Sequence, residues 1–163
     1  MASKNELITA LRTIPWFEQF SPHQLQRLVE IASFAEFSRG EDLFHEGDIE
    51  DFLYILLEGR IAIDIYAPGR GRITIYTAEP LEVVGWSSVT PVIRQRTASA
   101  RAVLDSRLLA FASRGVHQIC EADHDLGYMI MRRMANVVAG RLMVTRLQLV
   151  DLFAPPNEEH ALA

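Results

Sequence analysis

Polar side chains that could cap a helix or bind an anion lie in one stretch of the 163-residue sequence, at Ser87, Ser88 and Arg96, close to Gly85. Arginine pairs with carboxylates or phosphates, and a serine at the start of a helix caps its free backbone N–H groups. Arg96 is therefore either one half of a salt bridge at a turn or part of an anion-binding site. We expect the two serines to cap a short helix whether or not an anion binds there.

The other reactive residue types are too scattered to indicate catalysis or metal binding. No two histidines show H-x-H or H-x-x-x-H spacing, so we expect no metal site. A haem held by Cys120 and His117 is an alternative that the sequence leaves open. No G-x-S-x-G, Walker loop or C-x-x-C occurs, and we therefore expect no catalytic residues, no cofactor and a protein that is not an enzyme.

Composition and charge narrow the range of partners and locations. The net charge is -5 and the isoelectric point is near 5.5, which argues against DNA as a partner because phosphate backbones bind basic faces. The one cysteine allows no internal disulfide, in keeping with a reducing cytoplasm. The N-terminus has no signal-peptide core, and no apolar run approaches the roughly 20 residues of a membrane helix. We expect a cytoplasmic protein with no membrane contact.

The elements that must position these residues fall into three zones of a single domain, residues 1–153. Apolar residues at helical spacing predict helices over about 3–33, where Ser21 and Pro22 form a start signal. Alternating apolar residues broken by glycine turns predict short strands over about 34–112. The predicted fold is mainly β with flanking helices: an antiparallel double-stranded β-helix (β-roll or jelly roll) with C-terminal helices at about 113–153. The tail, 154–163, contains two prolines and is expected to be disordered.

The C-terminal zone carries a prediction about assembly. Ser113 is expected to cap a short helix, and Asp123 or Asp125 to begin a long one. Two apolar stripes run along the long helix, which is more than a single surface face requires. The second stripe is either buried in the core or covered by another subunit, and we expect a homodimer formed through the 126–153 helix.

Two segments of the strand zone resemble a known family. Residues 37–48, FSRGEDLFHEGD, are similar to an opening strand pair in which a glycine turn leads to a second strand ending in Glu-Gly-Asp. Residues 52–61, FLYILLEGRI, are similar to the strand–turn–strand that follows it. With the order of helices, roll and long helix, residues 14–153 resemble the cyclic nucleotide-binding domain of the catabolite-activator (Crp/Fnr-like) superfamily.

The resemblance assigns a binding role to a third segment, residues 83–102. In the family, a cassette begins Gly-Glu, forms a short helix whose backbone N–H groups hold the cyclic phosphate, and ends in an arginine that pairs with that phosphate. Gly85 matches the glycine and Arg96 matches the arginine, with Arg94 as the alternative register. The resemblance thus implies these ligand-binding residues: Gly85, Trp86, Ser87, Ser88, Arg96, Thr97 and Ala98.

Trp86 departs from the family at the position of the glutamate that binds the ribose 2′-hydroxyl. A charge-assisted hydrogen bond of that kind contributes roughly 1.5–3 kcal/mol when buried, and an indole offers only a donor. Its loss corresponds to about 10- to 100-fold weaker binding of a cyclic nucleotide. Trp86 either fills the sugar pocket or stacks on a different ligand.

The resemblance implies two possible functions. In the first, the domain is a non-enzymatic sensor that binds a cyclic nucleotide or another phosphorylated small molecule and dimerises through its C-terminal helix. In the second, it is a degenerate domain that has lost nucleotide binding and serves as a protein-interaction or dimerisation module. About ten residues follow Phe153, too few for the helix-turn-helix of the family's transcription factors. We therefore expect a standalone form whose output passes through an effector protein.

Overall fold

A computed structural model describes residues 3–49, 52–90 and 95–153 of the chain. Its helices are α1 (Lys4–Arg12), the 3-10 helix η1 (Pro15–Phe17), α2 (Pro22–Glu30), the 3-10 helix η2 (Trp86–Val89), α3 (Ser113–Ala122) and α4 (His124–Phe153). Its strands are β1 (Ala32–Phe37), β2 (Asp42–Phe44), β3 (Phe52–Glu58), β4 (Ile61–Ala67), β5 (Gly71–Ala78), β6 (Val83–Val84), β7 (Ser99–Ala102) and β8 (Ser106–Ala112). The predicted order of helices, strands and helices is confirmed.

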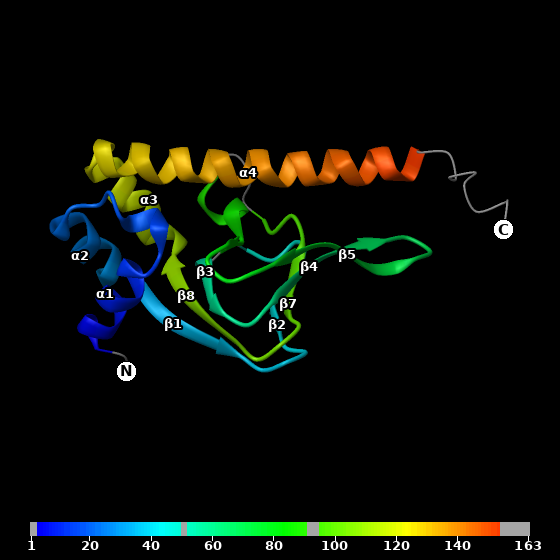
Figure 1. The fold of residues 1–163 in the computed structure, drawn as a ribbon, viewed down its shortest axis with the longest axis horizontal. Coiled ribbons are helices and arrows are strands. Elements are labelled where there is room, and N and C mark those ends of the chain that lie inside the picture. Colours follow the sequence, from blue (N-terminus) through cyan, green and yellow to red (C-terminus); the bar gives the residue numbers. More distant parts are fainter. Residues whose placement is uncertain (1–2, 50–51, 91–94, 154–163) are drawn as a thin grey trace, which may run out of the picture.

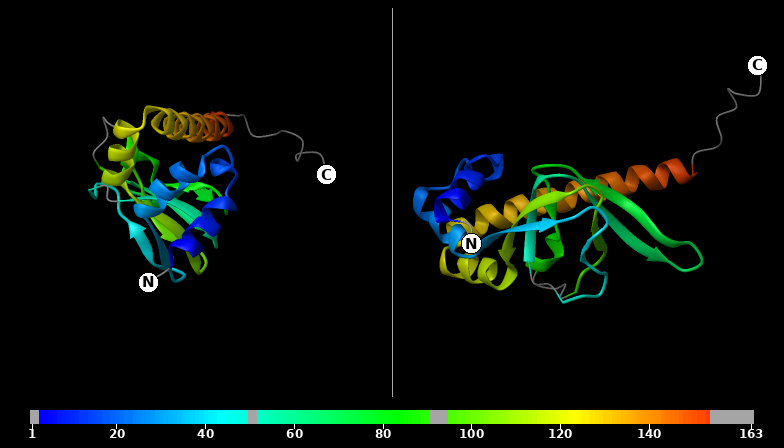
Figure 2. Two further views of the ribbon diagram at one scale, coloured as in Figure 1. Left: turned by 90° about the vertical axis from the view of Figure 1, so that its left-hand side faces the viewer. Right: turned by 90° about the horizontal axis from the view of Figure 1, so that it is seen from below.

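The strands form two four-stranded antiparallel sheets, with the orders β1-β8-β3-β6 and β2-β7-β4-β5. Figure 1 shows the sheets forming the roll, with α4 lying along its length. The two views in Figure 2 show α1, α2 and α3 gathered at one end of that roll. The predicted fold class, a mainly β jelly roll with flanking helices, is therefore confirmed.

Strand β3 reads as a nearly continuous apolar run because both of its faces are buried. Leu53 and Ile55 pack outward into the core formed with the N-terminal helices, α3 and the start of α4. Tyr54 and Leu56 point the other way, into the core between the two sheets. A strand with only one buried face would alternate with polar residues.

Local signals at several element ends behave as the sequence predicts. Ser21 caps α2 through a reciprocal capping box with Gln24, and Pro22 is the first helical residue. The hairpin between β4 and β5 turns at residues 68–70, as the proline and glycine there predict. The 154–163 tail and Arg94 lie outside the described residues.

The start of the C-terminal zone differs in part from the prediction. Ser113 does not cap α3: it is the first helical residue, Ala112 occupies the cap position, and no side-chain cap bond forms. The strand β8 runs directly into the helix, so no exposed turn is left for a capping serine. Asp123 does mark the start of α4, where its carboxylate accepts a hydrogen bond from the Leu126 N–H at 3.0 Å.

Helix α4 changes character along its length. Its first half is buried against the core through Leu126, Ile130 and Met134. Its second half passes over the β4–β5 hairpin (Figure 1), and the Gln148 amide donates to the Ile75 carbonyl at 3.0 Å. No helix within the described ranges is both long enough and apolar enough to cross a membrane.

Candidate functional site

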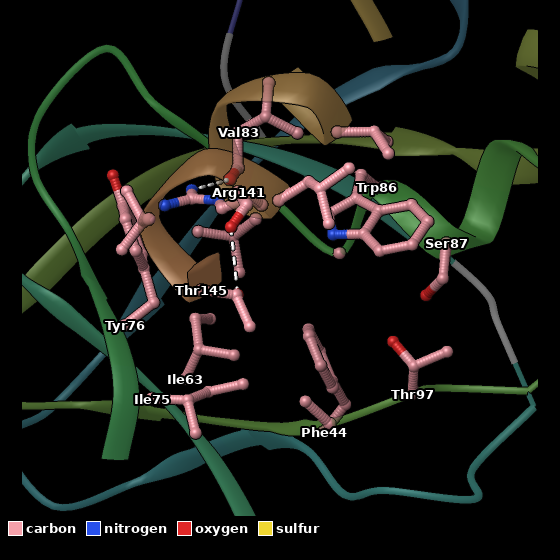
Figure 3. Close-up of a pocket in the computed structure, with 16 residues that line it drawn as sticks. Phe44, Ile63, Ile75, Tyr76, Val83, Trp86, Ser87, Thr97, Arg141 and Thr145 are labelled. Atoms are coloured by element: carbon pink, nitrogen blue, oxygen red, sulfur yellow. Dashed lines mark hydrogen bonds between the residues drawn. The ribbon is translucent and has the colours of Figure 1, made fainter. Parts of the chain in front are cut away.

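A cavity of about 310 Å³ lies between the roll and α4 (Figure 3). One wall comes from the β6–η2 segment and the residues just before β7, another from β2, β4 and β5, and the third from α4. The lining is mostly apolar and aromatic, with a few polar groups, as is typical of small-molecule sites. The lining residues are Phe44, Ile63, Ile75, Tyr76, Val83, Val84, Gly85, Trp86, Ser87, Thr97, Ala98, Val138, Arg141, Leu142, Val144 and Thr145.

Gly85 sets the path of the chain between β6 and η2. Its φ of +79° lies in the left-handed region that favours glycine. A Cβ at this position would also collide with Nη1 of Arg96. The sequence-predicted glycine is thus required both by backbone conformation and by the close approach of the arginine.

The structure brings most of the predicted binding residues to this cavity. Gly85, Trp86, Ser87, Thr97 and Ala98 all line it, although the chain separates them into two segments. Trp86 is half-buried and forms part of the wall (Figure 3). The indole therefore leaves a cavity of substantial volume beside it.

Ser88 and Arg96 lie behind the wall and are not among the lining residues. The expectation that Ser87 and Ser88 cap the short helix is wrong, because both lie inside η2, Gly85 occupies its N-cap position and no side-chain cap bond forms. Ser88 is buried there. The Arg96 side chain donates to the carbonyl oxygens of Gly85 at 3.2 Å and Phe52 at 2.6 Å, and it stacks on the Phe44 ring at 4.0 Å. With only 4% of its surface exposed, Arg96 joins the η2 segment to β2 and β3 in this conformation.

A second arginine, which the sequence reasoning missed, does line the cavity. Arg141 reaches in from α4, donates from Nη2 to the Val83 carbonyl at 3.1 Å and stacks on Tyr76 at 3.2 Å (Figure 3). Burial lowers the pKa of Arg141 to about 10, so the side chain stays charged at neutral pH.

The sequence contains one signal that points to Arg141. It follows Met134, which packs in the core, by seven residues, so the two side chains lie on nearly the same face of α4. A cation at a position where the helix pattern calls for an apolar residue is unusual. Such a residue either pairs internally or meets a ligand.

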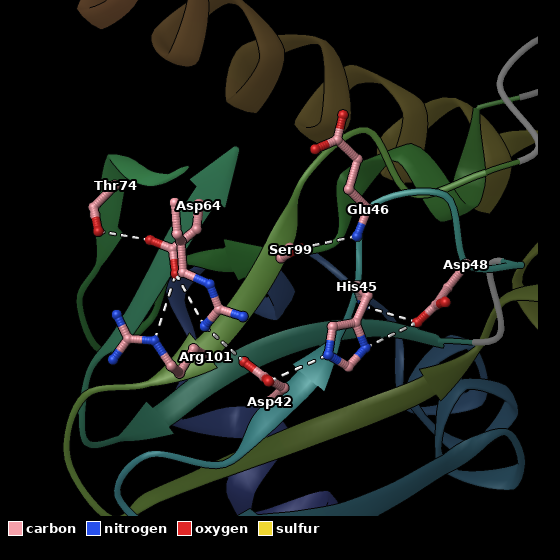
Figure 4. Close-up of polar contacts among 9 residues, drawn as sticks. Asp42, His45, Glu46, Asp48, Asp64, Thr74, Ser99 and Arg101 are labelled. Atoms are coloured by element: carbon pink, nitrogen blue, oxygen red, sulfur yellow. Dashed lines mark hydrogen bonds and ion pairs between the residues drawn. The ribbon is translucent and has the colours of Figure 1, made fainter. Parts of the chain in front are cut away.

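A second group of polar residues, none of which lines the cavity, clusters around β2, β4 and β7 (Figure 4). The fully buried Asp64 accepts from Thr74 Oγ1 at 2.6 Å and lies 3.5 Å from Arg101 Nε. His45 lies 3.2 Å from Asp42 and 3.6 Å from Asp48. Within the described residues, no three histidine, cysteine or acidic side chains gather as metal ligands would. These contacts form a structural network that ties the strands together.

The solved structures of other proteins share this fold. A cyclic nucleotide-binding domain from Methylobacillus flagellatus KT matches with a TM-score of 0.76 and 20% identity, over 94% of this chain and 86% of that one. The catabolite activator protein of Thermus thermophilus matches with a TM-score of 0.67 and 24% identity, over 85% of this chain and 62% of that one. At these identities the likeness concerns the architecture.

Comparison of sequences identifies the family. A curated relative, the Pycsar effector protein RsmPycTIR of Rhodovulum sp. (strain MB263), is 36% identical over 75 residues, which are 45% of this chain and 28% of that protein. The chain thus spans little more than a quarter of that relative. The family model for the cyclic nucleotide-binding domain matches residues 34–123, which is more than half of the chain and runs from within β1 to the end of α3. The chain therefore belongs to the cyclic nucleotide-binding domain family.

Proposed function

We propose that this chain is a non-enzymatic regulatory domain that binds a cyclic nucleotide, or another phosphorylated small molecule, in the cavity between the roll and α4. The observation that carries the proposal is the convergence of Gly85, Trp86, Ser87, Thr97 and Ala98 on one cavity of about 310 Å³. Family membership supplies the ligand class.

The phosphate of the ligand sits at the end of the cavity formed by η2 and Thr97. Hydroxyl groups of Ser87 and Thr97 face each other there (Figure 3). Arg96 lies directly behind Gly85, and its positive charge favours an anion at this end of the cavity. The remainder of the ligand then extends toward α4 and contacts Trp86 and the apolar floor.

A second candidate function is a degenerate domain that acts as a protein-interaction module. The favouring observation is that the Arg96 guanidinium donates hydrogen bonds to the backbone carbonyls of Phe52 and Gly85. The cavity beside Trp86 favours the sensor instead, because an indole that had replaced the ligand would fill the space. The two functions differ in whether any phosphorylated ligand binds.

We further propose that output passes through a homodimer and an effector protein. Exposed apolar side chains on the second half of α4 support the dimer: Met143, Leu147 and Val150 are 65%, 56% and 64% exposed. The curated relative is named an effector protein, which supports a role in signalling.

Titration calorimetry with cyclic AMP, GMP, CMP and UMP measures whether the protein binds a cyclic nucleotide and which one. We expect at least one to bind. A Trp86→Glu variant, with Trp86→Gln as its isosteric uncharged control, returns a carboxylate to the ribose position. The Glu variant should bind cyclic nucleotides about tenfold more tightly than the Gln variant. No binding at millimolar concentration by the wild type or the Glu variant would favour the interaction module.

A further inference from the structure

Folding places the Trp86 ring before any ligand arrives. Trp86 is the first residue of η2 and packs against the hydrophobic core formed with the N-terminal helices. The rest of η2, Ser87 to Val89, is buried, and Gly85 in front of it is held in the left-handed conformation. A polar group carried on such a ring loses little conformational freedom when it binds a ligand.

The indole N–H of Trp86 is available to a ligand. The nitrogen edge of the ring faces the interior of the cavity (Figure 3). Among the residues that the structure describes, none accepts a hydrogen bond from Nε1, and this atom is open to the cavity instead of being sealed inside the protein. An indole N–H donates and cannot accept. A ligand therefore meets an unused donor at this wall.

The same wall offers no strong acceptor. No aspartate or glutamate is among the described residues that line the cavity. The backbone carbonyls of Val83 and Gly85 already accept from Nη2 of Arg141 and Nη1 of Arg96. A hydroxyl hydrogen of the ligand that points at Trp86 thus gains nothing, whereas an oxygen lone pair gains a hydrogen bond.

The covalent structure of a 3′,5′-cyclic nucleotide decides which of its atoms meets Trp86. Its phosphate is closed onto the ribose ring, and the 2′-carbon adjoins the carbon that carries the 3′-phosphoester oxygen. With the phosphate between Ser87 and Thr97, as proposed above, the 2′-substituent lies close to the residue that precedes Ser87 in the chain. That residue is Trp86.

We propose that Trp86 is a specificity-determining residue that donates a hydrogen bond to the 2′-oxygen of the ligand, so that this site selects a 2′-acceptor and does not require a 2′-hydroxyl hydrogen. The inference rests on the proposed function, because it takes the ligand to be a cyclic nucleotide seated in this cavity. A carboxylate at this position would accept from a 2′-hydroxyl and repel an ether oxygen. The two side chains therefore rank 2′-deoxy and 2′-O-methyl sugars in opposite orders.

Calorimetry with the 2′-hydroxyl, 2′-deoxy and 2′-O-methyl forms of cyclic AMP, GMP, CMP and UMP tests the proposal. For each nucleotide that binds, the wild type should hold the 2′-hydroxyl and 2′-O-methyl forms about three- to tenfold more tightly than the 2′-deoxy form. Trp86→Phe keeps an aromatic ring without the donor, and its three affinities should agree within about twofold. In Trp86→Glu the 2′-hydroxyl form should bind most tightly and the 2′-O-methyl form least tightly.

The chain provides a matched control in its other tryptophan. Trp16 is half-buried and does not line this cavity, so Trp16→Phe makes the same chemical change elsewhere and should leave the sugar preference unchanged. Trp16→Phe also makes Trp86 the one remaining tryptophan of the chain. Its fluorescence should then change on ligand addition, with the half-saturation point that calorimetry gives.

The outcomes separate this inference from the proposed function. A wild type that binds 2′-deoxy and 2′-hydroxyl forms equally, a preference that persists in Trp86→Phe, or Trp86 fluorescence that saturating ligand leaves unchanged overturns this inference alone. Wild-type protein that binds no form of the four nucleotides overturns the proposed function together with it.

Discussion

The guanidinium carbon of Arg141 lies 3.2 Å from the centroid of the Tyr76 ring, so a cation from α4 is stacked on an aromatic face of β5. Such contacts are strongest where water is excluded. The stack closes the α4 end of the cavity, and the hydrogen bond from the Tyr76 hydroxyl to Glu82 holds the ring in place. This end of the cavity wall is thus built from residues of α4 and β5.

Ligand affinity should be insensitive to pH between 6 and 9. Burial lowers the pKa of Arg141 to about 10, which leaves it charged throughout this interval. Because this folded-state pKa is below the unfolded value, the charge opposes folding at lower pH, and that opposition is relieved only as pH rises through 10. Calorimetry at three pH values measures the affinity; a step near pH 6.5 would instead implicate a histidine.

Replacing Arg96 by Met should lower the free energy of unfolding by about 2–4 kcal/mol. The change removes the donors to the Gly85 and Phe52 carbonyls and the stack on Phe44. Urea denaturation measures the loss, with Arg146→Met as the control at an exposed site. A stability equal to that of the control would show that the two carbonyls do not depend on Arg96.

Gly59→Ala should be more destabilising than Gly69→Ala, although both residues have positive φ, at +95° and +77°. The left-handed backbone costs a non-glycine residue roughly 1–2 kcal/mol at each position. At Gly59 a Cβ also runs into the side chain and backbone of Ser106, whereas at Gly69 it meets nothing within 4 Å. Crowding should add about 1–3 kcal/mol at Gly59, read from the difference between their urea midpoints. Equal losses would mean that β8 moves aside freely.

Leu147→Glu should convert the proposed dimer into a monomer. A charge in the middle of the exposed stripe must be desolvated when two copies of α4 pack together. Leu152→Glu makes the same chemical change at a residue that is 76% exposed but lies about 140° around the helix, and it should leave the dimer intact. Light scattering at matched concentrations gives the mass; a monomeric wild type at high micromolar concentration contradicts the prediction.

Features governed by short-range chemistry were predictable from the sequence. The Ser21 cap and the 68–70 hairpin turn depend on residues within a few positions of each other. Both can therefore be predicted from a short segment of sequence. The prediction that Ser113 caps α3 was wrong because the role of this serine depends on the strand that precedes it. A strand that continues into the helix removes the turn in which a serine would cap.

The sequence by itself determined the roll, the long helix and one wall of the cavity. The glycine turns, the alternation of apolar and polar residues and the 83–102 segment each consist of contiguous residues, so they can be recognised without knowledge of the fold. Tertiary structure alone decided the rest. Arg141 meets the Val83 carbonyl across 58 residues of chain, and Arg96 turns toward Phe52 across 44. Such contacts depend on how α4 and the sheets pack, and no local propensity encodes the direction in which a long, flexible cation will point once they do.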